Sequence, residues 1–375
     1  MKTNDKNMAV IRHVVTYVSA DGSFGGPLSV AIAQTRELAC QGNTVELLAG
    51  WDGSQKLSIP GVTVRLFRTW RLGPSFTGLI SPGLWWYIIK SRSHTKIAHI
   101  HMGRDLISLI SAYIAMLLKV PFVVQTHGMV QVRRSYIVRM LDFVTTRRIF
   151  RKSKSIIALT EAEIAEVTAV AKSDVRIKLI VNGVSHTDTS DVVRNQKRIL
   201  FLARLHPRKR VLEFAAMCKI LREQNLDFEA IVVGPDEGDL SALRAYIKAN
   251  DLDAVLSYRG SIEPGTAVKT LAASGIFVLP SFGEIFPMTV LESLVAGTPV
   301  VTTRDSGMAP VLSALGAADI TDGTAANLAA SVTRLLTDEE YRIAMVRCGT
   351  TAITNEFNIQ SVVRCLEEIY ALDDQ

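Results

Sequence analysis

The sequence is poor in cysteine and has none of the cysteine patterns that bind zinc or form small disulfide frameworks. Its four cysteines, at positions 40, 218, 348 and 365, lie far apart, with no C-x-x-C pair and no cysteine–histidine cluster at zinc-ligand spacing. Isolated cysteines of this kind are typical of buried thiols in a reducing compartment. We therefore expect free, buried thiols and no metal site.

The sequence also lacks a long apolar run. The longest candidate, residues 106–118, has 13 residues without an ionisable group, whereas a membrane-spanning helix needs about 20. Residues 73–89 carry no charge either, but prolines and glycines interrupt them. The first residues have no apolar core followed by a small-residue cleavage site, so we expect no signal peptide and a cytoplasmic location.

Low-complexity segments are absent too, and charged residues make up 21% of the chain, which fits an ordinary globular protein. A single hydrophobic core rarely grows beyond about 300 residues, so a chain of 375 residues favours two domains. The spacing of apolar residues agrees, because strand and helix patterns alternate in two separate series.

The two series predict two parallel sheets. In the first, strand patterns at residues 10–19, 44–49, 96–101, 121–126, 155–159 and 177–181 accompany helix patterns at 28–39, 106–118 and 161–171, and a glycine-rich turn covers 21–27. In the second, strand patterns at 199–203, 228–233, 255–259, 276–280 and 299–302 accompany helix patterns at 211–224, 240–249, 268–273 and 288–296. Repeated strand–helix–strand units are typical of parallel sheets covered by helices.

A polar segment without periodicity, residues 185–198, is expected to link the two series. We therefore predict an α/β protein with two Rossmann-like, doubly wound lobes, residues 1–184 and 199–356. A helix within residues 357–375 is expected to cross back and pack on the first lobe. Doubly wound sheets bind ligands at the carboxyl ends of their strands, so we expect a site in a cleft between the lobes. The pattern alone does not identify the reaction.

Two glutamates eight residues apart flank a predicted helix start in the segment PSFGEIFPMTVLESLVAGTPV, residues 280–300. Glu284 lies in the loop after a strand, Pro287 lies where proline favours the first helical position, and Glu292 lies on the helix. Free N–H groups of a first helical turn can bind an anion. The two carboxylates can accept hydrogen bonds from hydroxyl groups on either side of it, as a nucleotide sugar would require. Either glutamate alone would be an ordinary surface residue.

Two cationic side chains follow the first strand of the second series. Arg204 comes directly after that strand and Lys209 comes five residues later, in the segment FLARLHPRKR. An arginine and a lysine that face one point can neutralise a diphosphate without a divalent ion and can stabilise a leaving nucleotide. The alternative is a basic turn exposed to solvent.

These segments together resemble the retaining glycosyltransferases of family 4, which have the GT-B fold. The glutamate segment is similar to the family's E-x7-E motif, and Arg204 with Lys209 is similar to its R-x4-K element. The glycine pair at 25–26, the T-H-G at 126–128 and the N-G-V at 182–184 follow the family's order, and the resemblance covers essentially the whole chain. One departure is Arg210, because the family often has glycine after the lysine.

The resemblance implies a role for each site residue. The catalytic residues would be Arg204, Lys209, Glu284 and His127, of which the two cations hold the diphosphate, Glu284 holds sugar hydroxyls and His127 contacts the donor sugar. Glu292 would hold the ribose hydroxyls. The remaining donor-binding positions would be Gly25, Gly26, Gly234, Phe286, Pro287, Met288 and Thr289. A tight turn at the glycine pair and an ordinary loop histidine are the alternatives for Gly25–Gly26 and His127.

Neighbouring family elements are expected to have supporting roles. His99 and His101 alternate along one strand, so we expect His99 to pack internally and His101 to face the cleft. Asn182 and Gly183 are expected to shape the turn between the lobes rather than to take part in catalysis.

The function implied is a retaining, metal-independent transfer of a sugar from a nucleotide diphosphate to a glycan or lipid-linked acceptor, in surface polysaccharide or glycolipid assembly. The donor is a substrate, and no cofactor is expected. Retention in this family is thought to use the leaving phosphate as the proton acceptor, so no separate base is needed. Two alternatives are a nucleotide-sugar epimerase and a non-catalytic nucleotide-sugar-binding subunit. A dehydrogenase is disfavoured because the G-x-G-x-x-G fingerprint is missing.

Basic residues are concentrated in one segment, residues 133–154, which has eight arginines and lysines against a single acidic residue, Asp142. Apolar residues at 137, 140, 141, 144 and 149 are spaced for one helix face, and aromatic residues at 85–87 lie in the same lobe. A basic amphipathic helix predicts attraction to an anionic membrane, here the inner face of the cell membrane, although a solvated basic face is the alternative. Without an aromatic-interleaved reader motif, nucleic-acid binding is disfavoured.

Overall fold

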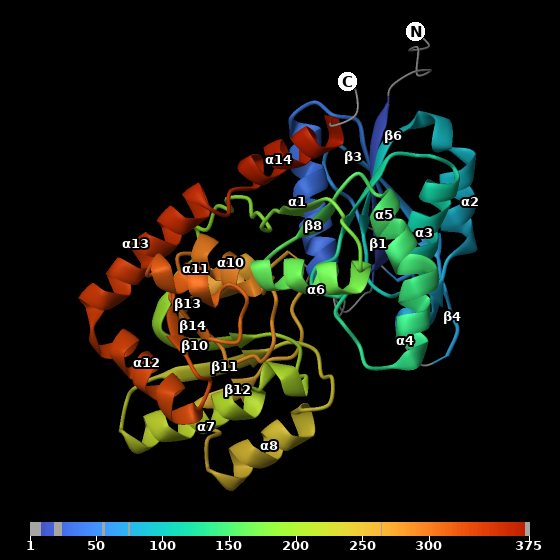
Figure 1. Ribbon diagram of the computed structural model, residues 1–375. Coiled ribbons are helices and arrows are strands. Elements are labelled where there is room, and N and C mark those ends of the chain that lie inside the picture. The colour runs from blue at the N-terminus through green and yellow to red at the C-terminus, as the bar shows by residue number, and fades with distance from the viewer. Residues whose placement is uncertain (1–8, 19–24, 55–56, 74–75, 264, 372–375) are drawn as a thin grey trace. The chain divides into compact units, whose positions relative to one another are not determined.

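The computed structural model describes residues 9–18, 25–54, 57–73, 76–263 and 265–371. These residues form two compact units (Figure 1). The first contains Met1–Gly183 and Ile359–Gln375, and the second contains Val184–Asn358. The glycine-rich turn expected at 21–27 lies largely outside the described residues, because the description resumes at Gly25.

The first unit is built on a seven-stranded sheet in the order β3-β2-β1-β6-β7-β8-β9, with every pair parallel. Its strands are β1 (Val10–Val18), β2 (Val45–Trp51), β3 (Val62–Arg68), β6 (Thr95–His101), β7 (Phe122–Gln125), β8 (Ile156–Ala158) and β9 (Ile177–Leu179). The strand order reverses between β1 and β6. At such a switch point the following loops diverge, and the carboxyl ends of the two strands leave room for a ligand.

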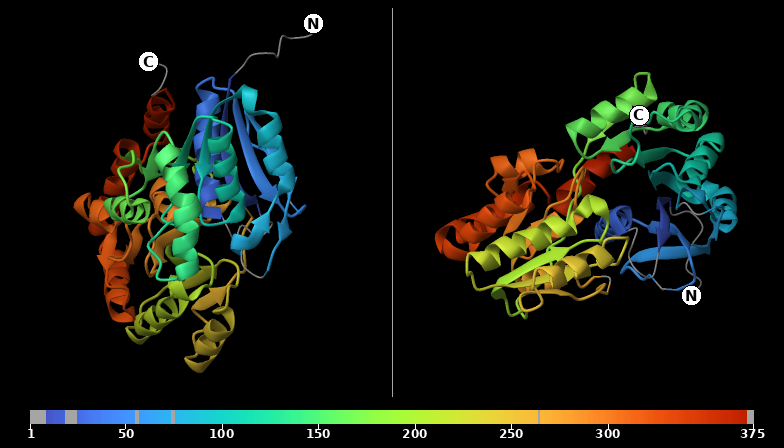
Figure 2. Two further views of the ribbon diagram at one scale, coloured as in Figure 1. Left: turned by 45° about the vertical axis from the view of Figure 1, so that its right-hand side comes forward. Right: turned by 90° about the horizontal axis from the view of Figure 1, so that it is seen from below.

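Helices cover both faces of this sheet (Figures 1 and 2). On one face, α1 (Gly25–Cys40) and α14 (Ile359–Ala371) share apolar clusters with β1, β2, β6 and β7. On the other face lie α2 (Pro82–Lys90), α3 (Leu106–Leu117), α5 (Arg147–Lys152) and α6 (Glu161–Ala171). The closing helix α14 thus contributes to the core of the first unit, through buried side chains such as Val363 and Leu366.

The second unit has a six-stranded sheet in the order β12-β11-β10-β13-β14-β15, again with every pair parallel. Its strands are β10 (Asn195–Leu202), β11 (Glu229–Val233), β12 (Leu256–Tyr258), β13 (Ser274–Leu279), β14 (Val300–Thr303) and β15 (Asp319–Thr321). Its helices are α7 (Val211–Glu223), α8 (Leu240–Ala249), α9 (Ala267–Ala272), α10 (Met288–Val295), α11 (Ala309–Ala314), α12 (Ala325–Thr337) and α13 (Glu339–Asn355). The main core lies where α7, α8 and α12 cover one face.

The predicted fold class, two doubly wound parallel sheets, is confirmed, but the segment expected as a linker is shorter than residues 185–198. Strand β10 begins at Asn195, inside residues 185–198, because the polar end of this strand is anchored. The Asn195 N–H donates to Ala273 O at 3.0 Å, and Arg198 forms an ion pair of 3.0 Å with Glu229. The first residues of β10 are polar and partly exposed, so they lack the run of apolar residues from which a buried strand is predicted.

Three of the four cysteines are not buried as expected, since Cys348 is half-buried and two others are exposed. Cys218 is buried in the second core, but Cys40 ends α1 and Cys365 lies on the outer side of α14, and both are exposed. All four are free thiols. In the part of the chain that the structure describes, no helix combines the length and apolarity that crossing a bilayer requires.

Candidate active site

The two-glutamate segment places a carboxylate against a lysine at the carboxyl end of the second sheet. Glu284 lies in the loop between β13 and α10, and Lys209 ends the short 3₁₀ turn η4 (Pro207–Lys209) after β10. Lys209 Nζ lies 2.9 Å from Glu284 Oε1, and both side chains are mostly buried, with exposed fractions of 15% and 17%. The structure therefore brings together two of the four expected catalytic side chains.

Arg208 fastens the lysine turn to the glutamate loop. Its Nη2 donates to Gly283 O at 2.5 Å, and the Phe282 N–H donates to Arg208 O at 2.8 Å. Arg208 thus has a structural role that the sequence left open, because its guanidinium is engaged with backbone rather than free for a phosphate.

Arg210 occupies a backbone conformation that explains the glycine common at this position in the resembling family. Its φ is +56°, in the left-handed region, where glycine is unstrained and other residues pay about 1–2 kcal/mol. Arg210 also begins α7 and lies 3.4 Å from Glu213. The departure from the family pattern thus retains the local fold.

Arg204 is not a free cation, contrary to the expectation of a side chain waiting for phosphate. Its Nη1 donates to both carboxylate oxygens of Glu237, at 2.8 and 2.7 Å. Glu237 follows β11, the neighbour of β10, and sequence reasoning missed it because an acidic residue in a loop carries no periodic signal. The arginine side chain is 40% exposed, so a ligand can reach it.

Helix α10 begins at the glutamate loop without a side-chain cap. Pro287 is its N-cap rather than its first residue, and no side chain caps the first turn, which contains Met288 and Thr289. Phe286 packs edge-on against Phe357, with ring centroids 6.1 Å apart, and so holds the loop in place. Uncapped N–H groups and the helix dipole together favour an anion at this end.

Glu292 lies on α10 with an unusual protonation equilibrium. Burial raises the pKa of its carboxyl group from 4.5 to about 7. A pKa that desolvation shifts this strongly makes Glu292 a candidate functional residue.

Gly234 ends β11 where only glycine fits. Its φ is +145°, and a Cβ there would lie 1.9 Å from Ala203 O. The Tyr258 hydroxyl donates to Gly234 O at 2.9 Å. The close approach of β10 and β11 explains the glycine by packing alone, and contact with a nucleotide base stays a prediction.

The first unit places its expected residues at the carboxyl ends of β1 and β7. Gly25 and Gly26 begin α1, and Gly26 is exposed with open space where a Cβ would lie. His127 follows β7 with φ +51°, in a loop fixed by Glu163. The Glu163 carboxylate accepts hydrogen bonds from the Thr126 hydroxyl at 2.5 Å and from the Gly128 N–H.

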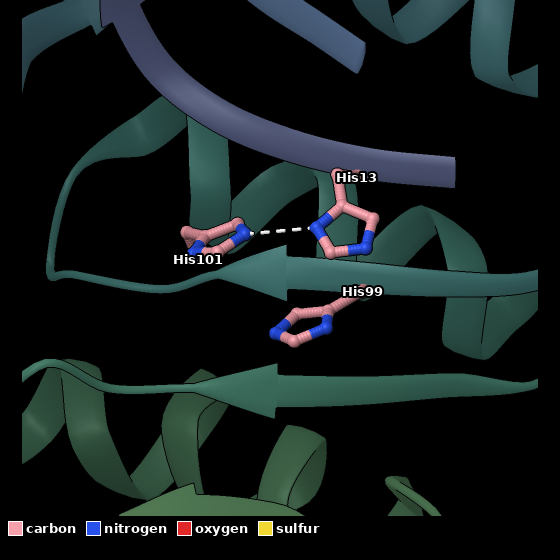
Figure 3. A group of neighbouring side chains, drawn as sticks. All are labelled: His13, His99 and His101. Carbon is pink, nitrogen blue, oxygen red and sulfur yellow. Dashed lines mark hydrogen bonds between the residues drawn. The ribbon is translucent and has the colours of Figure 1, made fainter. Parts of the chain in front are cut away.

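His101 was expected to face a cleft, but it is fully buried together with His99. Both lie on β6 beside His13 of β1 (Figure 3). The His99 ring stacks on His13 and on His101, with centroids 4.4 and 4.7 Å apart, and the His13 and His101 rings are tilted at 5.3 Å. The His101 and His127 rings stack in turn, and their Nδ1 and Nε2 atoms lie 2.7 Å apart. His101 therefore reaches the site through His127. The sequence missed His13 because β1 reads as a continuous buried strand.

Asn182 and Gly183 are confined by their neighbours, in keeping with a structural turn. Asn182 is buried, and its Oδ1 accepts a hydrogen bond of 3.2 Å from Gln125 Nε2. A Cβ on Gly183 would lie 2.7 Å from the Cα of Ile359, at the start of α14. The glycine is thus required by close packing of two backbone segments.

Two family models match adjoining parts of the sequence. The model described as Glycosyltransferase Family 4 matches residues 24–188, and the one described as Glycosyl transferases group 1 matches residues 187–351. Solved glycosyltransferase structures align with nearly the whole chain. The chain belongs to the GT-B glycosyltransferases. The two family matches meet within five residues of the boundary between the units of this GT-B protein.

Solved GT-B structures share the fold at low sequence identity. Anabaena Alr3699/HepE in complex with UDP-glucose has a TM-score of 0.74 and 17% identity, and the alignment covers 97% of this chain and 99% of that one. WaaG, a glycosyltransferase involved in lipopolysaccharide biosynthesis, has a TM-score of 0.67 and 13% identity, with coverage of 97% and 99%.

Curated relatives match over shorter regions. AmsK of Erwinia amylovora, an amylovoran biosynthesis glycosyltransferase, is 30% identical over 48% of this chain and 46% of its own length. A D-inositol 3-phosphate glycosyltransferase of Pseudarthrobacter chlorophenolicus is 27% identical over 62% and 59%. An Escherichia coli galactosyltransferase that uses UDP-Gal and a diphosphoundecaprenol-linked acceptor is 28% identical over 37% and 33%. The matched regions thus span 33–59% of the length of these three curated relatives.

Proposed function

We propose that this GT-B protein transfers a sugar from a nucleotide diphosphate to a glycan or lipid-linked acceptor, with retention of configuration and without a divalent metal ion. The observation that carries the proposal is the Lys209–Glu284 pair of 2.9 Å beside the uncapped start of α10. The pair offers a cation for a phosphate and a carboxylate for a sugar hydroxyl in one loop. The solved complex of HepE with UDP-glucose and the named activities of the relatives support a sugar-nucleotide donor.

The nucleotide half of the donor is proposed to bind along α10. The Glu292 carboxylate accepts hydrogen bonds from the ribose hydroxyls, and the N–H groups of Met288 and Thr289 bind diphosphate oxygens. Lys209 turns from Glu284 towards the diphosphate, and Arg204 adds a second cation by loosening its bond to Glu237. Fixed cations then do the work that a metal ion does in other sugar transferases.

Transfer is proposed to proceed on one face of the sugar. The bond between the anomeric carbon and the phosphate oxygen breaks, and the acceptor oxygen forms the new bond on the same face. The proton of the acceptor hydroxyl passes to the leaving phosphate oxygen, whose developing charge Lys209 and Arg204 stabilise. Glu284 and His127 hold the sugar hydroxyls during this step, and no separate base is required.

A thermal-shift panel of UDP-, GDP- and ADP-sugars, each with and without EDTA, tests the proposal. One nucleotide should raise the melting temperature strongly, and EDTA should leave that shift unchanged. The shift should disappear in Glu292→Ala, while Glu223→Ala on the exposed side of α7 serves as a matched control. Retained binding in Glu292→Ala would refute the assigned nucleotide site.

The acceptor is proposed to be presented at an anionic membrane surface, the inner face of the cell membrane, that binds residues 133–154. This segment forms α4 (Tyr136–Leu141), a π-helical turn η3 (Asp142–Thr146) and α5. The apolar face predicted from sequence is divided: Ile149 is buried in the first core and Leu141 packs partly against it, whereas Ile137, Met140 and Val144 are exposed. Exposed apolar side chains here are Tyr136, Ile137, Met140, Phe143 and Val144.

The division has a physical cause. Asp142 is buried and pairs with Arg104 at 2.9 Å, which fixes η3 against the lobe and turns the following residues inward. An exposed apolar patch beside exposed arginines 133, 134 and 139 matches a lipid interface with anionic headgroups.

Flotation with anionic and neutral vesicles tests the membrane proposal. The protein should float with anionic vesicles only, and replacing arginines 133, 134 and 139 by serine should abolish flotation. Replacement of the exposed arginines 36 and 92 outside this segment by serine provides the control. Equal flotation of both variants, or none by the unmodified protein, would refute it.

A further inference from the structure

A chain of hydrogen-bonded side chains, buried except at His127, connects His127 to the closing helix α14. His127 Nε2 lies 2.7 Å from His101 Nδ1, and His101 Nε2 lies 3.1 Å from His13 Nδ1 (Figure 3). The Tyr370 hydroxyl lies 3.3 Å from His13 Nε2 and 2.6 Å from His99 Nδ1. His99 Nε2 lies 3.2 Å from Gln125 Oε1, which ends the chain.

All four imidazoles are neutral at physiological pH. Burial lowers the pKa of His99 and of His127 to about 3, with repulsion from His99 adding to the second. Burial, and then neighbouring histidines, lower the pKa of His13 and His101 well below 6.5. A neutral imidazole has one donating and one accepting nitrogen, so each hydrogen bond in the chain constrains the next one.

Gln125 sets the direction of the chain. Its Nε2 donates to Asn182 Oδ1 at 3.2 Å, and its Oε1 also accepts from Gln34 Nε2 at 3.2 Å, so the oxygen faces His99. His99 must therefore donate through Nε2 and accept at Nδ1. The Tyr370 hydroxyl must donate to that Nδ1, and its oxygen must then accept from His13 Nε2.

The distances at Tyr370 agree with this direction. An O–H donor forms short bonds, with a mode near 2.7–2.8 Å, whereas an N–H donor forms longer ones. The hydroxyl lies 2.6 Å from the His99 nitrogen to which it donates and 3.3 Å from the His13 nitrogen that donates to it. Continuing along the chain, His101 donates through Nε2 to His13 Nδ1, and His127 donates through Nε2 to His101 Nδ1.

We propose that His101, His13, Tyr370 and His99 are positioning residues that hold His127 with its proton on Nε2, so that its Nδ1 accepts a hydrogen bond from a substrate hydroxyl. The hydroxyl-bearing substrate is the sugar of the proposed function, on which this part of the inference rests. Within the described residues no side-chain hydrogen bond occupies His127 Nδ1, and His127 is the half-buried member of the chain. Helix α14 is thus connected to His127 through the Tyr370 hydroxyl.

A metal centre is the competing interpretation of the same cluster. His13, His99 and His101 bring ligand nitrogens within 4.8 Å of one another, so their composition fits a divalent ion. Both nitrogens of each of these three rings already have hydrogen-bond partners. A metal ion would have to break several of these bonds, whereas the hydrogen-bonded chain uses both nitrogens of His13, His99 and His101.

Nuclear magnetic resonance of protein labelled with ¹⁵N in histidine tests the chain without any substrate. Long-range ¹H–¹⁵N spectra should show the Nε2–H tautomer for His13, His99, His101 and His127 from pH 6 to 8, with no titration. A predominance of Nδ1–H in these rings, or titration within that range, would overturn the proposal. Selective shifts of their ¹⁵N signals on adding one equivalent of Zn²⁺ would overturn it in favour of a metal site.

The variant Tyr370→Phe removes the hydroxyl and keeps the ring. The His127 spectrum should change to a mixture of tautomers, and kcat should fall about 10-fold with KM nearly unchanged, as expected for the loss of one oriented hydrogen bond. Tyr113→Phe, on α3 of the same unit, should change neither. An unaltered His127 spectrum in Tyr370→Phe would refute the positioning role. Because the spectra need no turnover, they separate this failure from a failure of the proposed function.

Discussion

Lys209 and Glu284 form a 2.9 Å ion pair between two loops that follow neighbouring strands, β10 and β13. In the free protein each side chain neutralises the other, which keeps a partly buried cation at the carboxyl edge of the sheet. In the proposed function a diphosphate replaces the carboxylate as the lysine's partner, and the carboxylate then accepts a sugar hydroxyl. The proposal therefore predicts that this pair links anion binding to sugar binding.

Replacing Lys209 by methionine tests this link. We expect kcat/KM to fall by about 100-fold or more, because the cation stabilises charge that develops on the leaving diphosphate. Affinity should fall for the nucleoside diphosphate and not for the nucleoside, as isothermal titration calorimetry can measure. Lys219→Met on α7 is the control, since Lys219 pairs with Glu223 on the same helix. Unchanged diphosphate affinity in Lys209→Met would contradict the assignment.

The raised pKa of Glu292 predicts that the difference in stability between the unmodified protein and the variant Glu292→Gln depends on pH. Its pKa is about 7 in the folded protein and 4.5 is its ordinary value, so between these pH values the folded state holds a proton that the unfolded state has lost. Stability therefore decreases as pH rises through this window and levels off above it. Glu292→Gln should match the unmodified protein near pH 4.5 and exceed it by up to about 3 kcal/mol above pH 7.

Denaturant unfolding of the two proteins at several pH values measures this difference. Although Glu292→Gln should be more stable above pH 7, it should bind the nucleotide more weakly than the unmodified protein. The reason is that the variant loses a charged acceptor for the ribose hydroxyls. A stability difference that stays constant from pH 4.5 to 8 would show that Glu292 is not a desolvated carboxyl group.

The substitution Gly26→Ala distinguishes a structural role of this glycine from a role in ligand binding. Gly26 is in the first turn of α1, where a Cβ meets no atom within 4 Å, so Gly26→Ala should leave stability unchanged or raise it by up to about 1 kcal/mol. If a ligand approaches this backbone closely, KM for donor or acceptor should nevertheless rise. Melting temperature and steady-state kinetics on one preparation measure both effects. Unaltered kinetics would leave Gly26 as part of an ordinary turn.

Gly234 should give the contrasting result. A Cβ at this position would lie 1.9 Å from Ala203 O, so Gly234→Ala must separate β10 from β11. We expect a loss of several kcal/mol of stability, at the upper end for single substitutions, because backbone strain and overpacking act together. Chemical denaturation provides the measurement. A loss below about 1 kcal/mol would show that the strand ends tolerate displacement.

The sequence predicted the elements that have a clear period and the motifs that lie close together in the chain. Helices such as α6 and α8 were expected at the residues where they occur, because apolar spacing and flanking turns agree there. Glu284 and Lys209 were predicted separately, but nothing in the sequence indicated their contact. That contact depends on β10 and β13 lying side by side.

The sequence could not show contacts between residues that lie far apart along the chain. Tyr370 lies on the last helix, and it contacts His13 across 357 positions and His99 across 271. Glu237 pairs with Arg204 only because β11 adjoins β10. Arg210 illustrates a different limit: the left-handed backbone that it adopts is set by the turn into α7, while its side-chain type gives no such signal.

The most direct test of the central claim is to follow sugar transfer in EDTA and to determine the anomeric configuration of the product by NMR. We predict turnover at the same rate with EDTA as with added magnesium, and a product with the configuration of the donor. An absolute requirement for a divalent cation, or an inverted product, would contradict the account.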